Sequence, residues 1–112
     1  MDMLYYIYIG SNRVTIDHLS KIAGGMFMAV SSCNKAAKVI DGIRERYNTS
    51  ILYEESTPQK DSQNITFLHK RFPRVYIILI TEGLQKEHRK LYLQAGVNNT
   101  LSPMASEESS SK

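Results

Sequence analysis

The sequence has little of what marks membrane, disulfide-bonded or metal-binding proteins. Its single cysteine, Cys33, excludes an internal disulfide, and no second Cys or nearby His stands at the spacing of a metal site. No apolar run approaches the roughly 20 residues that cross a bilayer. The first residues also lack the basic flank and the cleavage signal of a secretory peptide. We therefore expect a cytoplasmic protein with no metal site and no membrane contact.

Positive charge is not concentrated in the chain either. The formal net charge is only +3, and the basic residues are spread along the sequence. The densest basic stretch runs from His69 to Arg71, where a helix is expected to end and where cations suit the negative end of the helix dipole. These features favour a structural role for the basic residues and predict no direct contact with nucleic acid.

The composition predicts one compact domain. The chain has 112 residues, of which 42% are hydrophobic and 22% charged, which is enough for one core and too little for two. We expect residues 1–105 to form this domain. Residues 106–112 are polar and rich in serine, so we expect a tail that is at most a truncated last helix.

Hydrophobic patterns predict strands that alternate with helices. The expected strands cover residues 4–9, 26–30, 51–53, 75–80 and 97–101. Residues 75–80 are apolar without interruption, which is typical of a strand covered on both faces. We expect this strand to be the central one.

A helix is predicted between each pair of successive strands. The first begins after Ser11 or Asn12, either of which can cap it, and the second carries an apolar stripe that includes Ile40. We expect residues 54–63 to form a polar loop before the third helix, and Gly96 to end the fourth as a C-cap. Strand and helix units of this length predict right-handed crossovers and a doubly wound parallel sheet. In such a sheet the binding crevice lies at the carboxyl ends of the strands.

The chain resembles the receiver domains of two-component response regulators over nearly its whole length. Residues 67–81 are similar to the family's third helix and fourth strand with its terminal Thr, and residues 91–96 to its fourth helix ending in Ala-Gly. Glu54, followed four residues later by Pro58, is similar to the phosphoacceptor Asp and the Pro beyond it. The resemblance implies a three-layer α/β/α, flavodoxin-like fold with a five-stranded parallel sheet whose fifth helix is truncated or absent.

The resemblance also assigns residues to the family's functional positions. Glu54 stands at the phosphoacceptor position, and Thr81 at the switch hydroxyl. The family's acidic pair falls on Gly10 and Ser11, and its aromatic switch residue on Thr100. The lysine falls on Ser102 or Pro103, depending on which of two alignments is used.

These substitutions remove most of the groups that receiver chemistry needs. Phosphoryl transfer to a receiver uses an Asp nucleophile, an acidic pair that holds Mg²⁺ and a Lys that neutralises the phosphoryl group. Neither Gly10 nor Ser11 supplies a carboxylate, and neither Ser102 nor Pro103 supplies a cation. We therefore predict a degenerate receiver, or pseudo-receiver, that is not an enzyme, has no catalytic residue and uses no cofactor.

Glu54 leaves two interpretations open. In the first, its permanent negative charge partly mimics the phosphorylated state and biases Thr81 inward. In the second, Glu54 and Glu55 are solvated acids that open a polar loop, because no lysine holds the mimic in place.

Three functions remain compatible with the sequence. The first is a phosphorylation-independent interaction or regulatory module that binds a protein partner, with a homodimer through the face of the predicted fourth helix and fifth strand as one form. The second is a regulatory domain of a longer protein that controls a fused DNA-binding or enzymatic output domain. The third is a flavodoxin-like domain that binds a small ligand in the crevice near Ser11 and Thr81, since a fold alone does not fix a function.

Overall fold

The computed structural model describes residues 3–104, in which strands and helices alternate along the chain. The strands are β1 (Met3–Ile9), β2 (Met26–Val30), β3 (Tyr47–Glu54), β4 (Tyr76–Ile80) and β5 (Asn99–Leu101). The helices are α1 (Arg13–Ile22), α2 (Cys33–Ile43), α3 (Pro58–Arg71) and α4 (Lys86–Ala95). Within this part of the chain, no helix is long and apolar enough to span a membrane. The prediction that a fifth helix is truncated or absent concerns residues 105–112, which lie outside the described range.

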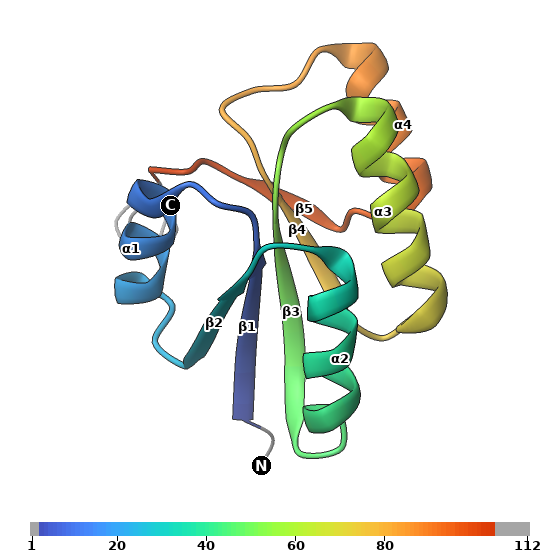
Figure 1. Cartoon of the computed structure of the whole chain (residues 1–112). Coiled ribbons are helices and arrows are strands. Elements are labelled where there is room, and N and C mark those ends of the chain that lie inside the picture. Colours follow the sequence, from blue (N-terminus) through green and yellow to red (C-terminus); the bar gives the residue numbers. More distant parts are fainter. Residues whose placement is uncertain (1–2, 105–112) are drawn as a thin grey trace.

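The strands form one parallel sheet in the order β2-β1-β3-β4-β5. Helix α1 lies on one side of this sheet, and α2, α3 and α4 lie on the other (Figure 1). This arrangement confirms the three-layer, doubly wound α/β fold. It also brings the carboxyl ends of β1, β3, β4 and β5 to one edge, where a site was expected.

Alternation along the strands divides the core between the two faces of the sheet. On the α1 side, Tyr8, Leu52 and Ile80 pack against the apolar stripe of α1. On the other side, the neighbouring strand residues Ile7, Ile51 and Leu79 belong to a larger cluster that α2, α3 and α4 cover. Both layers therefore anchor β1, β3 and β4, the strands whose ends carry the site.

Strand β3, and not β4, occupies the middle of the sheet. The prediction for residues 75–80 was wrong on this point, because an apolar run shows that both faces of a strand are covered but not where the strand lies in the order. Strand β3 has no long apolar run, because it begins with polar residues such as Asn48 and Ser50 and is fully apolar only from Ile51 to Tyr53. The pattern of the sequence therefore did not indicate that it is the central strand.

Helix α3 begins at Pro58, so the loop predicted for residues 54–63 is much shorter than expected. A proline fits the first position of a helix, where its fixed φ is already helical and its missing N–H is not needed. The polar first turn of α3 is held by Asp61, which is buried and accepts a hydrogen bond from the backbone N–H of Ser56.

The helix ends follow the capping signals in the sequence. The side chain of Asn12 accepts a hydrogen bond from the backbone N–H of Thr15, which settles the choice between Ser11 and Asn12 as the cap of α1. Gly96 ends α4 with a φ of +126°, as predicted for a C-cap. A Cβ atom at Gly96 would lie only 2.7 Å from the ring of His69, so α4 can close onto α3 only through a glycine.

We expect Gly96→Ala to lower the free energy of unfolding by about 1–3 kcal/mol, the cost of a strained backbone. The matched control is Gly42→Ala in α2, where an added Cβ meets nothing within 4 Å. That variant should gain about 0.5–1 kcal/mol from the better helix propensity of alanine. Urea denaturation followed by circular dichroism measures both changes, and equal losses in the two variants would contradict this account.

Candidate functional site

The site at the carboxyl edge of the sheet is centred on Glu54, the last residue of β3. Its carboxylate points toward the start of α1 and accepts hydrogen bonds from three donors. The hydroxyl of Tyr8 donates to Oε1 over 2.6 Å, and the backbone N–H groups of Asn12 and Ser11 donate over 3.0 and 3.5 Å. Glu54 therefore ties the end of β3 to β1 and to the N-terminus of α1.

Electrostatics favour this position of the carboxylate. The N-terminus of a helix carries a partial positive charge, and the N–H groups just before α1 are aimed at the acid. Tyr8 is fully buried below it. Burial, and then the neighbouring Glu54, raise the pKa of the Tyr8 phenol well above its ordinary value, so the hydroxyl remains a hydrogen-bond donor. These contacts contradict the interpretation of Glu54 as a merely solvated acid.

Gly10 makes room for Glu54. A Cβ atom at residue 10 would lie 2.6 Å from the Cβ, Cδ and Oε1 atoms of Glu54, far inside van der Waals contact. The backbone of Gly10 also has a φ of +156° and donates its N–H to the carbonyl of Val30 over 3.0 Å. The absence of a side chain at residue 10 is therefore what allows Glu54 to reach α1.

Thr81, at the end of β4, contacts Glu55 and not Glu54. Its hydroxyl donates to Oε1 of Glu55 over 2.6 Å and accepts the N–H of Gly83 over 3.1 Å. The backbone N–H of Glu55 in turn donates to the carbonyl of Ile80 over 3.1 Å. Two consecutive acids thus hold opposite sides of the site: Glu54 the start of α1, and Glu55 the loop that leads from β4 to α4.

The other predicted positions lie apart from this centre. Thr100 is exposed on β5 opposite Leu79, and the N–H of Thr81 reaches the neighbouring Leu101 carbonyl over 2.9 Å. Ser102 is exposed, and its hydroxyl accepts the N–H of Met104 over 3.2 Å. Pro103 is half-buried. The structure thus brings Gly10, Ser11 and Glu54 together, whereas the hydrogen bonds to the Glu54 carboxylate come from Tyr8, Ser11 and Asn12 and not from Thr100, Ser102 or Pro103.

Solved structures with this architecture were found, although no family model and no curated protein matches the sequence. The CheY-like protein tadZ from Pseudomonas aeruginosa has a TM-score of 0.78 at 12% identity, over 95% of this chain and 85% of that one. The signal receiver domain of an HD domain-containing protein from Pseudomonas fluorescens has a TM-score of 0.76 at 14% identity, over 97% and 82%. An atypical orphan response regulator has a TM-score of 0.67 at 11% identity, over 88% and 80%.

The chain has the CheY-like receiver fold. The resemblance seen in the sequence is therefore confirmed at the level of the fold. At these sequence identities the likeness shows the fold but not the function of any residue. The roles of Glu54, Thr81 and the other site positions therefore stay predictions.

The Mg²⁺ site that a receiver fold implies does not fit the residues of this chain. A hard divalent cation takes several oxygen ligands, and carboxylates supply most of them. At the end of β1 this receiver fold has Gly10 and Ser11, and the one carboxylate nearby, that of Glu54, is already engaged by Tyr8 and by backbone N–H groups. Across residues 3–104, no group of three or more His, Cys, Asp or Glu side chains is placed to hold a metal ion.

A buried carboxylate behind the site was not foreseen from the sequence. Asp61 is 1% exposed and accepts hydrogen bonds from the hydroxyls of Tyr92 and Tyr53, over 2.7 and 3.1 Å, in addition to the N–H of Ser56. Burial first, and then Asp61, raise the pKa of Tyr92 well above its ordinary value. This network joins α3 to β3 and α4. The one available signal was an acid in the first turn after Pro58, which marks a helix start but not its burial.

A pocket of about 440 Å³ opens beside Glu54, between the start of α2 and α3. Its lining includes Ser32, Cys33, Glu54, Lys60 and Asp61. Burial, together with the negative charge of Asp61, raises the pKa of the Cys33 thiol to about 11. The pocket also reaches Ile9 and Gly10 at the end of β1, but Ser11 and Thr81, where a ligand was expected, are not among its lining residues.

The contact between Gly10 and Glu54 can be tested with a double-mutant cycle. Gly10→Ala should destabilise the protein by about 1–3 kcal/mol, because the added Cβ meets the acid. The loss should be smaller in a Glu54→Ala background, with a coupling of about 1 kcal/mol, since two of the three crowded atoms are gone. Gly83→Ala, where nothing lies within 4 Å, serves as the control and should be additive with Glu54→Ala. Additivity for Gly10 as well would contradict the contact.

The pKa of Cys33 predicts slow alkylation in the folded protein. Since the folded-state pKa is about 11 and the reference value is 9.0, the initial rate with iodoacetamide should keep rising tenfold per pH unit from pH 7 to 10. Asp61→Asn should make the rate level off at lower pH, because one of the two causes of the shift is removed. Glu54→Gln is the control and should leave the profile unchanged. A wild-type profile that levels off at pH 9 would show that the thiol is not perturbed.

Proposed function

We propose that this chain is a degenerate receiver domain that acts in signal transduction by binding a protein partner, without phosphoryl transfer. The observation that carries the proposal is the hydrogen bonding of the Glu54 carboxylate. Its carboxylate holds the hydroxyl of Tyr8 and the N–H of Asn12, in a place where a working receiver would hold a metal ion and a phosphoryl group. Both donors bind the same oxygen, Oε1, and a carboxylate oxygen that already accepts two hydrogen bonds is a poorer nucleophile.

The contact between Thr81 and Glu55 supports a fixed conformation. A switch hydroxyl must be free to move toward the phosphoryl group, and here it donates to Glu55 and binds the backbone of Gly83. The charge of Glu54 consequently acts through α1 and not through Thr81. The domain is proposed to stay in one conformation that partners recognise.

Two of the similar structures make this use of the fold reasonable. One is an atypical orphan response regulator whose structure revealed a phosphorylation-independent regulatory mechanism. Another is the receiver domain of an HD domain-containing protein. For this chain we propose a cytoplasmic location, a protein partner or a fused output domain, a homodimer as a further form, and no direct contact with nucleic acid.

The proposal is tested by treating the protein with acetyl phosphate and Mg²⁺ and measuring its intact mass. Neither wild type nor Glu54→Asp should gain a phosphoryl group, because both lack the acidic pair for Mg²⁺ and the lysine, and wild type also lacks the Asp. Denatured protein in the same reagent controls for nonspecific modification. A Mg²⁺-dependent gain of one phosphoryl group on folded wild type would return the chain to the phosphorelay proteins.

The pocket beside Glu54 favours a second candidate, a domain that binds a small ligand. A volume of about 440 Å³ falls within the roughly 300–1,000 Å³ that is usual for ligand sites. Lys60 and the start of α2 give it positive potential beside the two acids. Raised thermal stability of the wild type, but not of Lys60→Ala, with a nucleotide or flavin would support this candidate; no change with any of them would exclude it.

A further inference from the structure

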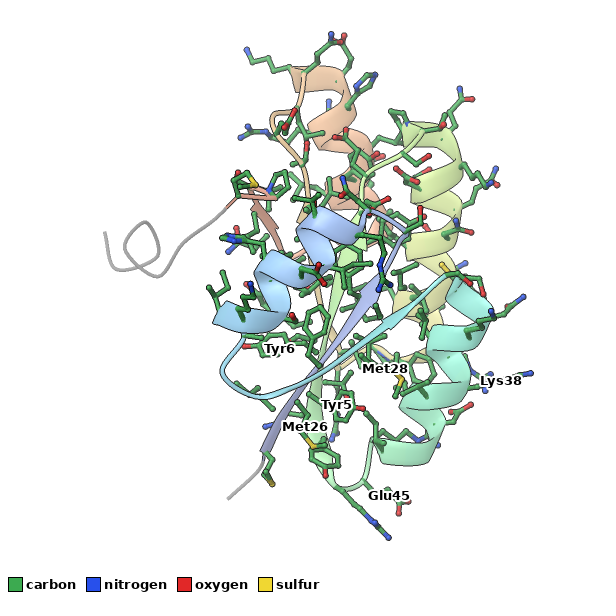
Figure 2. The ribbon with its side chains drawn as sticks, turned by 60° about the vertical axis from the view of Figure 1, so that its left-hand side comes forward. Tyr5, Tyr6, Met26, Met28, Lys38 and Glu45 are labelled. Atoms are coloured by element: carbon green, nitrogen blue, oxygen red, sulfur yellow. The ribbon has the colours of Figure 1, made fainter. Side chains whose placement is uncertain are left out.

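Strand β2 is an unprotected edge of the sheet. It is the first strand in the order and is paired only with β1 among the residues that the structure describes. Its sequence, Met26 to Val30, contains no charge and no proline. Met26 is 43% exposed and Met28 39% exposed, and both lie on the side of the sheet that α2 occupies (Figure 2). Soluble proteins usually protect such an edge with charges, prolines or a covering segment.

The free hydrogen-bonding groups of β2 can be assigned from its pairing. The carbonyl of Val30 accepts the N–H of Gly10 and therefore faces β1. Because the backbone groups of successive residues point to opposite sides of a strand, those of Met28 also face β1, and those of Phe27 and Ala29 face outward. Phe27 and Ala29 thus offer two N–H and two carbonyl groups to a further strand.

The opposite edge of the sheet has none of these features. Strand β5 has only three residues, which include Asn99 and Thr100, and Pro103 follows it closely. A short polar edge beside a proline is a poor template for another strand. Pairing at the β2 edge is therefore favoured over the α4 and β5 side.

We propose that β2 pairs antiparallel with β2 of a second copy of this chain, so that two sheets become one continuous sheet. The geometry suits a two-fold axis through Met28. Phe27 would lie opposite Ala29 of the second copy, and the outward N–H and carbonyl groups of these two residues would form hydrogen bonds with each other. The Met28 residues of the two copies would face each other as a close pair without backbone hydrogen bonds. The exposed methionines of both copies would meet on one face of the seam.

The charges beside the strand fit this orientation. Helix α2 runs from the end of β2 back toward its start, so Lys35 is near the end of β2, where its ammonium contacts Ser31, and Glu45 is near the start. Figure 2 shows Glu45 near the lower end of α2, at the end of the molecule where Met26 lies, and Lys38 on the side of α2 that faces away from Met28. An antiparallel pair keeps the two acids apart and sets the Glu45 end of each copy at the Lys35 end of the other.

The proposal names the partner of the interaction module proposed above, but it does not depend on the state of Glu54. A seam of five residues buries less than the roughly 1,200 Å² of a standard stable interface, so association should depend on concentration. Sedimentation velocity of the unphosphorylated wild type should show a monomer at low micromolar and a dimer at several hundred micromolar concentration. A wild type that stays monomeric throughout this range would overturn the proposal.

Two variants test the seam directly. Ala29→Pro removes an outward N–H that the monomer does not use, so the fold should remain and the dimer should be lost. Met28→Lys places like charges opposite each other on the two-fold axis and should act in the same way, while Val14→Lys, on the exposed side of α1, serves as the control. Circular dichroism checks the fold of each variant. Dimerisation that is unchanged in folded Ala29→Pro would overturn the pairing.

Crosslinking then tests the register. In a Cys33→Ser background, Met28→Cys should form a disulfide-linked dimer on mild oxidation, because directly opposed Cβ atoms lie ~4.5–5.5 Å apart. Met26→Cys is the control, since the two copies of residue 26 would be ~13 Å apart along the seam. Equal crosslinking of the two variants would overturn the two-fold axis at Met28. Neither experiment uses a phosphodonor, so its outcome is separate from that of the phosphorylation test.

Discussion

The carboxylate of Glu54 organises the carboxyl edge of this domain. It takes the hydroxyl of Tyr8 from β1 and the N–H of Asn12 from the start of α1, so a single side chain joins the central strand to its neighbour and to the helix that covers them. In a receiver fold this edge is where charged groups meet. Here the negative charge is satisfied by a phenol and by a helix N-terminus, with no cation needed.

Strand geometry explains why two successive acids have different partners. Side chains of consecutive residues leave a strand on opposite faces. Tyr8, Leu52 and Glu54 lie toward α1, whereas Tyr53, which contacts Asp61, lies toward α3 and α4. Glu55 continues on that second side and meets Thr81. The carboxylate of Glu54 and the hydroxyl of Thr81 are therefore engaged separately.

Much of the fold could be predicted from the sequence, because it depends on local patterns. The apolar stripes and the caps at Asn12 and Gly96 locate the helices, and strand and helix alternation implies the parallel sheet. The site was harder to predict. The partners of Glu54 and Glu55 lie 42 and 26 residues away in sequence, and the burial of Asp61 depends on two tyrosines that only the tertiary structure brings to it. The start of α3 was also missed, because its first turns are polar and have the composition of a loop.

The residues at positions 10 and 54 depend on each other. A glutamate at the end of β3 can reach the start of α1 only because Gly10 has no side chain, and a carboxylate at residue 10 would occupy the space that Glu54 fills. Gly10 leaves the space at the end of β1, and the Glu54 side chain fills it and reaches the start of α1. An aspartate at residue 54 is one methylene shorter and would lose the contact with α1, while Gly10 and Ser11 would still supply no carboxylate for a metal ion.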